Sequence, residues 1–164
     1  MKFKKLVFII SVFAVFLYFL GFLFPIHLEK EPLSDNFGFT ELFFYNLKTE
    51  VFSILLGCIT LGVYSITYLF LNFFSMGSIS SSLMKESSII DVLSMFVVHG
   101  VFEIPAMILT VAFGIYIPWR IIIMLKNKEK YILPLKYMIK IFNLILILTI
   151  LAATIEVFIT PKLI

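Results

Sequence analysis

Long stretches without a charged residue constrain this chain more than any other feature of its sequence. The first stretch runs from Leu6 to Phe24 and contains 19 residues, none of them charged. A helix needs about 20 apolar residues to cross the roughly 30 Å hydrocarbon core of a bilayer. A helix also satisfies its own backbone hydrogen bonds, which lipid cannot do for it. The stretch therefore predicts an uncleaved membrane-spanning helix over residues 6–24.

The composition agrees with a chain that lies mostly in lipid. Of its 164 residues, 62% are hydrophobic and 14% are charged, and the mean hydropathy is +1.12. Soluble domains are about half apolar and about a quarter charged. The formal net charge is only +3 and the single cysteine, Cys58, lies in an apolar run, so nucleic-acid partners and a cysteine metal motif are not expected. We predict an all-α, polytopic membrane bundle that forms one domain over residues 1–164.

Four further apolar segments follow the first and set the expected number of crossings. Residues 89–125 are 37 nearly uncharged positions, or about 55 Å of helix, which is too long for one crossing. Two crossings with a tight turn near Glu103–Pro105 fit this length, and one crossing with a re-entrant or broken segment is the alternative. The resulting prediction is an outer loop over 25–48 and further spans over 51–72, 89–103, 106–125 and 138–159.

Lysines set the expected orientation of these spans. Three of them, Lys2, Lys4 and Lys5, precede the first span, and five more lie between residues 126 and 140. Cytoplasmic loops of membrane proteins carry an excess of Lys and Arg. We therefore expect a multi-pass protein of the cell membrane whose amino terminus is cytoplasmic and whose carboxyl terminus, after five crossings, lies outside.

Ionisable side chains inside the apolar segments are the strongest indication of a functional site. A charge at the bilayer centre costs about 2.5–3.5 kcal/mol on insertion scales, so such groups usually face the bundle interior. Glu50 shares a helix face with Asn46, and Glu103 shares one with His99, four residues before it. With Glu156 near the end of the last span, these groups are expected to converge in one pocket just beneath the outer surface. The alternative is a hydrogen-bond cluster that only holds the helices in register.

The sequence contains none of the common catalytic or metal-binding signatures. A Gly-rich phosphate loop, a Gly-x-Ser-x-Gly elbow and a His-Glu-x-x-His pair are all absent. His99 and Glu103 alone form a weak metal signal, because zinc usually takes three or four protein ligands. We therefore expect no metal and no cofactor, and the prediction for catalysis leans toward a protein that is not an enzyme.

Two sequence blocks resemble a known family. The blocks are His99-Gly100-x-x-Glu103-x-Pro105-Ala106 and Ile155-Glu156-x-Phe158-Ile159-Thr160-Pro161. In this order, and after a span that contains Asn46, they resemble the stage II sporulation protein M family from about residue 46 to residue 161. An Asn-Gly step of the family's middle segment is replaced here by Asn72-Phe73, with Gly77 following.

The resemblance implies a multispanning protein without an established enzymatic reaction. The name-giving members scaffold a complex with two extracytoplasmic peptidoglycan hydrolases, and other relatives accompany circular-bacteriocin genes. The implied partners are the lipid bilayer and other membrane or extracytoplasmic proteins, such as wall hydrolases or an exporter.

Two classes of function follow from these observations. The favoured one is a non-enzymatic scaffold or accessory protein that assembles cell-wall or peptide-export machinery. Its binding or structural pocket would contain Asn46, Glu50, His99, Gly100, Glu103, Pro105, Glu156 and Thr160. The alternative is an intramembrane peptidase or transpeptidase, or a bacteriocin maturation or immunity protein, that uses a His/Glu pocket. Its catalytic candidates would be His99, Glu103, Glu156 and Glu50.

Overall fold

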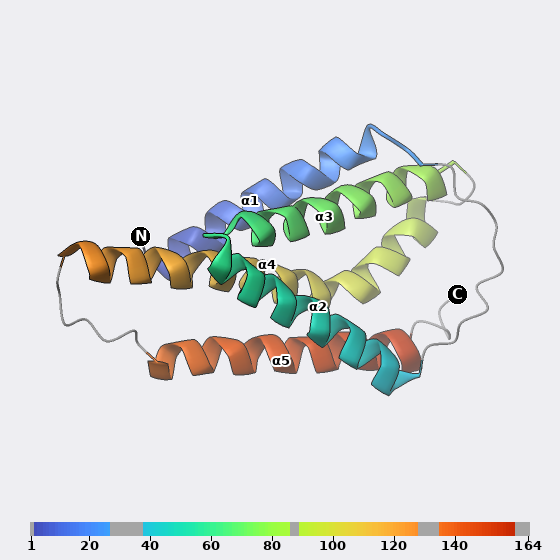
Figure 1. The fold of residues 1–164 in the computed structure, drawn as a ribbon. Coiled ribbons are helices and arrows are strands. Elements are labelled where there is room, and N and C mark those ends of the chain that lie inside the picture. Colours follow the sequence, from blue (N-terminus) through green and yellow to red (C-terminus); the bar gives the residue numbers. More distant parts are fainter. Residues whose placement is uncertain (1, 27–37, 86–88, 128–134, 160–164) are drawn as a thin grey trace.

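The protein is a bundle of five α-helices, shown in Figure 1 as a computed structural model. The structure describes residues 2–26, 38–85, 89–127 and 135–159, and side chains of residues 89–99 are outside this description. The helices are α1 (Phe3–Phe22), α2 (Phe39–Ile59), α3 (Val63–Leu83), α4 (Ile89–Asn127) and α5 (Leu135–Phe158). The predicted all-α membrane bundle is confirmed.

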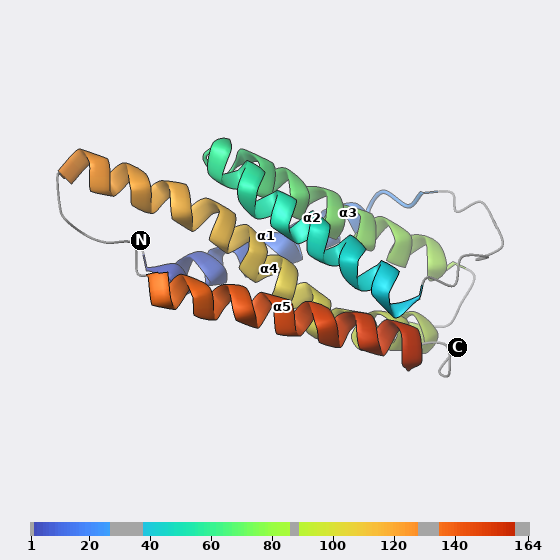
Figure 2. The ribbon, with the colours of Figure 1, turned by 60° about the horizontal axis from the view of Figure 1, so that its bottom comes forward.

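Successive helices run in opposite directions along the bundle, as both ribbon views show (Figures 1 and 2). One end, here called the lysine end, holds the start of α1, the α2–α3 turn, the end of α4 and the start of α5. Its described basic residues are Lys2, Lys4, Lys5, Arg120, Lys126, Lys136 and Lys140, and none of the acidic residues that the structure describes lies there. The opposite end, where α2 begins and α5 ends, carries Glu41 and Glu156 and is called the carboxylate end.

Within the described residues, four stretches are long and apolar enough to cross a membrane. They are α1, α2, residues Gly100–Lys126 within α4, and α5. α3 is also 21 residues long and has no charged residue, but six of its residues are serines. The chain is therefore a multi-pass membrane protein, and its serine-rich helix, α3, packs along α1.

The prediction of a single span over residues 51–72 was wrong. The chain turns at residues 60–62, where Leu61 has φ 55° and Gly62 has φ 96°. Two successive left-handed residues end a helix, and the Gly62 N–H donates to the carbonyl of Gly57 at 2.7 Å. The expected outer loop over 25–48 was wrong in its second part, because α2 begins at Phe39 with Glu41 accepting a hydrogen bond from the Gly38 N–H at 3.2 Å.

The prediction of a turn near Glu103–Pro105 was also wrong. The expected spans 89–103 and 106–125 belong to one helix, the 39-residue α4, which passes through Pro105 and Pro118. Proline removes one backbone hydrogen bond and kinks a helix without always ending it. α4 is visibly bent in Figure 1. Since one predicted span is split and two are fused, the chain still passes along the bundle five times.

α1 and α3 pack closely because two glycines let their backbones meet. A Cβ added at Gly21 would fall on the Phe74 carbonyl, and one added at Gly77 would fall on the Tyr18 carbonyl. Beside these contacts, the Ser78 hydroxyl donates to the Gly21 carbonyl at 3.1 Å. Small residues at such positions are the usual means of helix association in lipid. This side of the bundle is therefore held by backbone-to-backbone contact.

Candidate functional site

The candidate site lies along the seam between α2 and α4, which run in the same direction (Figure 1). Near the lysine end the seam is tight, because a Cβ added at Gly57 would lie 3.3 Å from the backbone of Gly114. The Ser65 hydroxyl of α3 fits beside these glycines and donates to the Ser53 carbonyl at 2.8 Å. Toward the carboxylate end the same faces carry larger residues at spacings of four and three: Asn46, Glu50 and Ser53 on α2, and Glu103, Met107 and Thr110 on α4.

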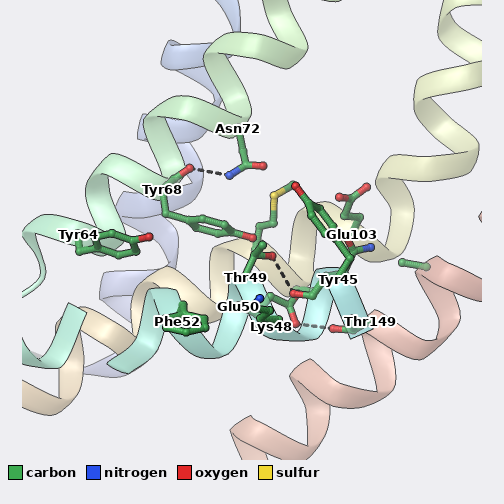
Figure 3. A pocket seen from close by; sticks show the side chains of 14 residues that line it. Tyr45, Lys48, Thr49, Glu50, Phe52, Tyr64, Tyr68, Asn72, Glu103 and Thr149 are labelled. Carbon is green, nitrogen blue, oxygen red and sulfur yellow. Dashed lines mark hydrogen bonds between the residues drawn. The ribbon is translucent and has the colours of Figure 1, made fainter. Parts of the chain in front are cut away.

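On the carboxylate-end side of the tight seam, the helices enclose a cavity of about 450 Å³, shown in Figure 3. Four helices, α2 to α5, contribute its walls. Alanine and methionine side chains from α4 and α5 form the apolar part, and the remaining walls are polar or aromatic. The lining residues are Tyr45, Asn46, Lys48, Thr49, Glu50, Phe52, Tyr64, Tyr68, Asn72, Glu103, Ala106, Met107, Thr149 and Ala152.

Glu50 is the most buried ionisable group of this site, with 3% of its surface exposed. The Thr149 hydroxyl of α5 donates to Glu50 Oε2 at 2.7 Å and also contacts the Ile145 carbonyl at 2.9 Å. A buried carboxylate without a hydrogen bond is strongly destabilising, so this contact ties α2 to α5. Thr149 was not among the residues predicted for the pocket, and the fold brings it to Glu50.

The site extends from the middle of the bundle to the carboxylate end. A second cavity of about 430 Å³ is lined by Leu42, Tyr45, Asn46, Glu103 and Glu156, so it shares three residues with the first. Glu156 lies seven residues beyond Thr149 on α5, or about 10 Å along the helix. Glu50 and Glu156 therefore lie at different levels of the bundle, Glu103 lines both cavities, and the three carboxylates line two neighbouring cavities where one pocket was expected.

The first cavity opens sideways, between α2 and α3. Four of its lining side chains are exposed: Lys48, Tyr45 (66%), Phe52 (47%) and Tyr64 (40%). Figure 1 shows α2 and α3 diverging from their connecting turn, and the exposed residues lie on these two helices. The opening therefore lies on the side of the bundle, between its two ends, next to the apolar helix α2.

Not every residue that the sequence placed in the pocket lies there. Asn46, Glu50, Glu103 and Glu156 come together at the two cavities. Gly100 lies on another side of α4, in an apolar groove of about 540 Å³ between α1, α3 and α4.

The remaining predicted members of the pocket lie elsewhere or outside the described residues. Pro105 is exposed and lines neither polar cavity. The backbone of His99 belongs to α4, one turn before Glu103, but its side chain lies outside the described part of the chain. Thr160 also lies outside the described residues.

The aromatic walls of the cavity were missed by the sequence analysis. Tyr64, Tyr68 and Asn72 follow each other at four-residue spacing on α3 and point toward the cavity in Figure 3. That spacing was visible in the sequence, but it has meaning only after Gly62 is recognised as the start of a new helix. A site that combines carboxylates with tyrosine rings can bind hydrogen-bond donors and cations.

The described side chains do not supply a metal centre. In the regions that the structure describes, no group of three or more His, Cys, Asp and Glu side chains is placed to hold a metal ion. Glu103 and Glu156 each take part in further interactions within the protein. The described residues of the two cavities carry groups for hydrogen bonding and for charge recognition.

Comparison with known proteins places this architecture in a family. An uncharacterized protein of Methanocaldococcus jannaschii is 29% identical to the chain over 167 residues, covering 92% of the chain and 93% of the relative. No solved structure matches the chain. Residues 6–161, which include every described residue of the two polar cavities, match the family described as stage II sporulation protein M, and the chain belongs to this family.

Proposed function

We propose that the protein is a non-enzymatic membrane scaffold whose carboxylate cavities dock membrane segments of partner proteins. The observation that carries this proposal is the position of three glutamates, from α2, α4 and α5, on connected cavities of about 450 and 430 Å³. A cluster that only held helices together would be packed without cavities, as the contacts of Gly21 and Gly77 between α1 and α3 are.

The charge distribution supports an orientation for this scaffold. Of the nine basic residues in the described part of the chain, all but Lys48 and Lys85 lie at the lysine end, where that part has no acidic residue. An excess of Lys and Arg marks the cytoplasmic side of membrane proteins. The amino terminus is then cytoplasmic, and the carboxylate end faces outward. Partners that dock there would belong to extracytoplasmic machinery, such as wall hydrolases or a peptide exporter.

Affinity purification from native membranes tests the proposal. The double variant Glu103→Gln, Glu156→Gln keeps the shape of both side chains and removes their charge, so we expect it to lose proteins that the wild type retains. Glu41→Gln is the matched control, because Glu41 is exposed on α2 and lines neither cavity. Full retention of partners by the double variant would show that this pocket is not the docking site.

The same purification also separates a scaffold from an enzyme. A scaffold releases or retains whole partner proteins, whereas an intramembrane peptidase with a disabled site would accumulate its substrate. A short peptide that remains bound to the double variant and is absent from the wild type would contradict the scaffold.

A further inference from the structure

The cavity around Glu50 has the chemistry of a site for one ammonium group. We propose that a lysine side chain, carried by a transmembrane segment of a partner protein, enters between α2 and α3 and binds the Glu50 carboxylate. This inference rests on the proposed scaffold function, because it names the group that the docked partner presents.

Aromatic rings line the cavity that contains Glu50. Tyr45, Phe52 and Tyr64 are exposed aromatic residues of the cavity lining, and Tyr68, which is less exposed, also lines the cavity (Figure 3). The face of an aromatic ring carries negative potential and attracts ammonium groups, more strongly when water is excluded. The phenol oxygens add hydrogen-bond acceptors. An anionic or purely apolar ligand would gain little from this arrangement.

The carboxylates of Glu50 and Glu103 line the same cavity. Glu50 is held by a neutral partner, the Thr149 hydroxyl, at 2.7 Å from Oε2. Glu103 lines the same cavity from α4, and the basic residue of the lining, Lys48, is exposed at its mouth. A hydrogen bond between an ammonium and a carboxylate is stronger than one between neutral groups, particularly away from water. The charge of the cavity therefore complements a cation.

The direction of the opening decides how the cation arrives. The exposed lining residues belong to α2 and α3, at levels between the ends of both helices, and these helices diverge in Figure 1. A ligand that enters here comes from the bilayer. A water-soluble amine would have to enter from the carboxylate end through the second cavity, past Glu156 and Glu103.

The depth of Glu50 distinguishes between the amines that a bilayer contains. Its partner Thr149 lies nine residues beyond the exposed Lys140, or about 13 Å into a hydrocarbon core of about 30 Å. A lipid headgroup stays at the membrane surface, whereas a lysine on a spanning helix can sit at this level. Such a lysine is costly in lipid unless it is paired, so pairing with Glu50 favours association of the two helices.

The experiment uses the full chain reconstituted in lipid vesicles and synthetic spanning peptides. The probe is an apolar helix of about 24 residues with one central lysine, compared with the same peptide carrying norleucine at that position. Association is measured by fluorescence energy transfer from the protein to a labelled peptide. We expect at least about tenfold tighter association of the lysine peptide, in line with a charged hydrogen bond.

Two variants identify the group that binds the lysine ammonium. Glu50→Gln can still accept the Thr149 hydrogen bond, and we expect it to remove the preference for lysine. Glu41→Gln, on the same helix but outside both cavities, should retain the preference. Equal association of both peptides with the wild type, or an unchanged preference in Glu50→Gln, would overturn the inference.

A second series needs no variant of the protein. Moving the lysine seven residues toward either end of the peptide shifts it by about 10 Å, and we expect the preference to fall. A preference that is independent of lysine depth would overturn the inference. So would a preference that disappears when phosphatidylethanolamine is added to phosphatidylcholine vesicles, since the site would then hold a lipid headgroup.

The lysine inference and the scaffold proposal can fail independently of each other. If native partners are lost by the Glu103→Gln, Glu156→Gln variant while lysine and norleucine peptides associate equally, docking at the cavities stands and the ammonium is wrong. If neither the partners nor the lysine peptide distinguish the variants, both proposals fall.

Discussion

Two halves of the bundle differ in how their helices meet: in the closed half, the backbones of α1 and α3 touch beside an apolar groove, and in the open half, polar cavities lie between α2, α4 and α5. On one side, α1 and α3 meet through Gly21 and Gly77 with no room for a Cβ. On the other side, α2, α3 and α5 leave polar cavities beside α4 that reach Glu50. Small residues bring backbones together, whereas long polar side chains keep helices apart. Backbone contacts hold the closed half together, and the open half is where we propose that a partner binds.

The largest effect is expected in the closed half. Gly77→Ala places a Cβ on the Tyr18 carbonyl, which is backbone and cannot move aside. We expect a loss of stability at the upper end of about 1–3 kcal/mol, measured as a lower unfolding temperature in detergent. Gly38→Ala is the control, because its Cβ would meet only Glu41 Oε2 at 3.9 Å, and it should cost less than about 1 kcal/mol. Equal stability of the two variants would contradict the close α1–α3 packing.

In the open half the contact that ties α2 to α5 should have an intermediate effect. Thr149→Val removes the donor to a buried carboxylate and should cost about 1.5–3 kcal/mol of unfolding free energy. Thr154→Val is the matched control, because the Thr154 hydroxyl also donates to the carbonyl four residues earlier, at 2.7 Å, but lies in an exposed position. Chemical denaturation of the two variants should separate them. Indistinguishable midpoints would mean that the Thr149–Glu50 bond contributes nothing.

The smallest effects should come from two buried serines, one in each half. The Ser78 hydroxyl donates to the Gly21 carbonyl, so Ser78→Ala should cost about 1 kcal/mol. The Ser53 hydroxyl is fully buried and has no hydrogen-bond partner in the described part of the chain. Ser53→Ala should therefore be neutral or stabilising by up to about 1 kcal/mol. A greater loss for Ser53→Ala than for Ser78→Ala, in the same thermal assay, would reverse the comparison.

The sequence predicted the outer helices of the bundle well and the middle ones poorly. α1 and α5 begin and end within three residues of the predicted spans 6–24 and 138–159, because uninterrupted apolar runs leave little choice. The bounds of the middle helices depend on backbone conformations that a hydropathy profile does not reveal. Leu61 and Gly62 adopt positive φ inside an apolar run, and α4 continues through Pro105 although proline often ends a helix.

The candidate site was predictable where it depended on helical spacing. Asn46 and Glu50 share a face of α2. Because burying a charged carboxylate in lipid costs free energy, Glu103 and Glu156 were expected to lie near them. The contribution of α3 was not predictable without the break at Gly62, because a continuous helix carries Tyr64 and Tyr68 away from Glu50. Gly100 was misplaced because a position next to a polar motif does not determine which face of a helix it occupies.

The most direct test of the open and closed halves is photo-crosslinking in native membranes. A benzophenone side chain replaces either Tyr64, at the rim of the Glu50 cavity, or Phe16, an exposed ring on α1. The account predicts a crosslinked partner protein from position 64 that is absent from position 16 and is lost when Glu50→Gln is added. Crosslinking of the same partner from position 16, or an undiminished crosslink from position 64 in the Glu50→Gln protein, would contradict it.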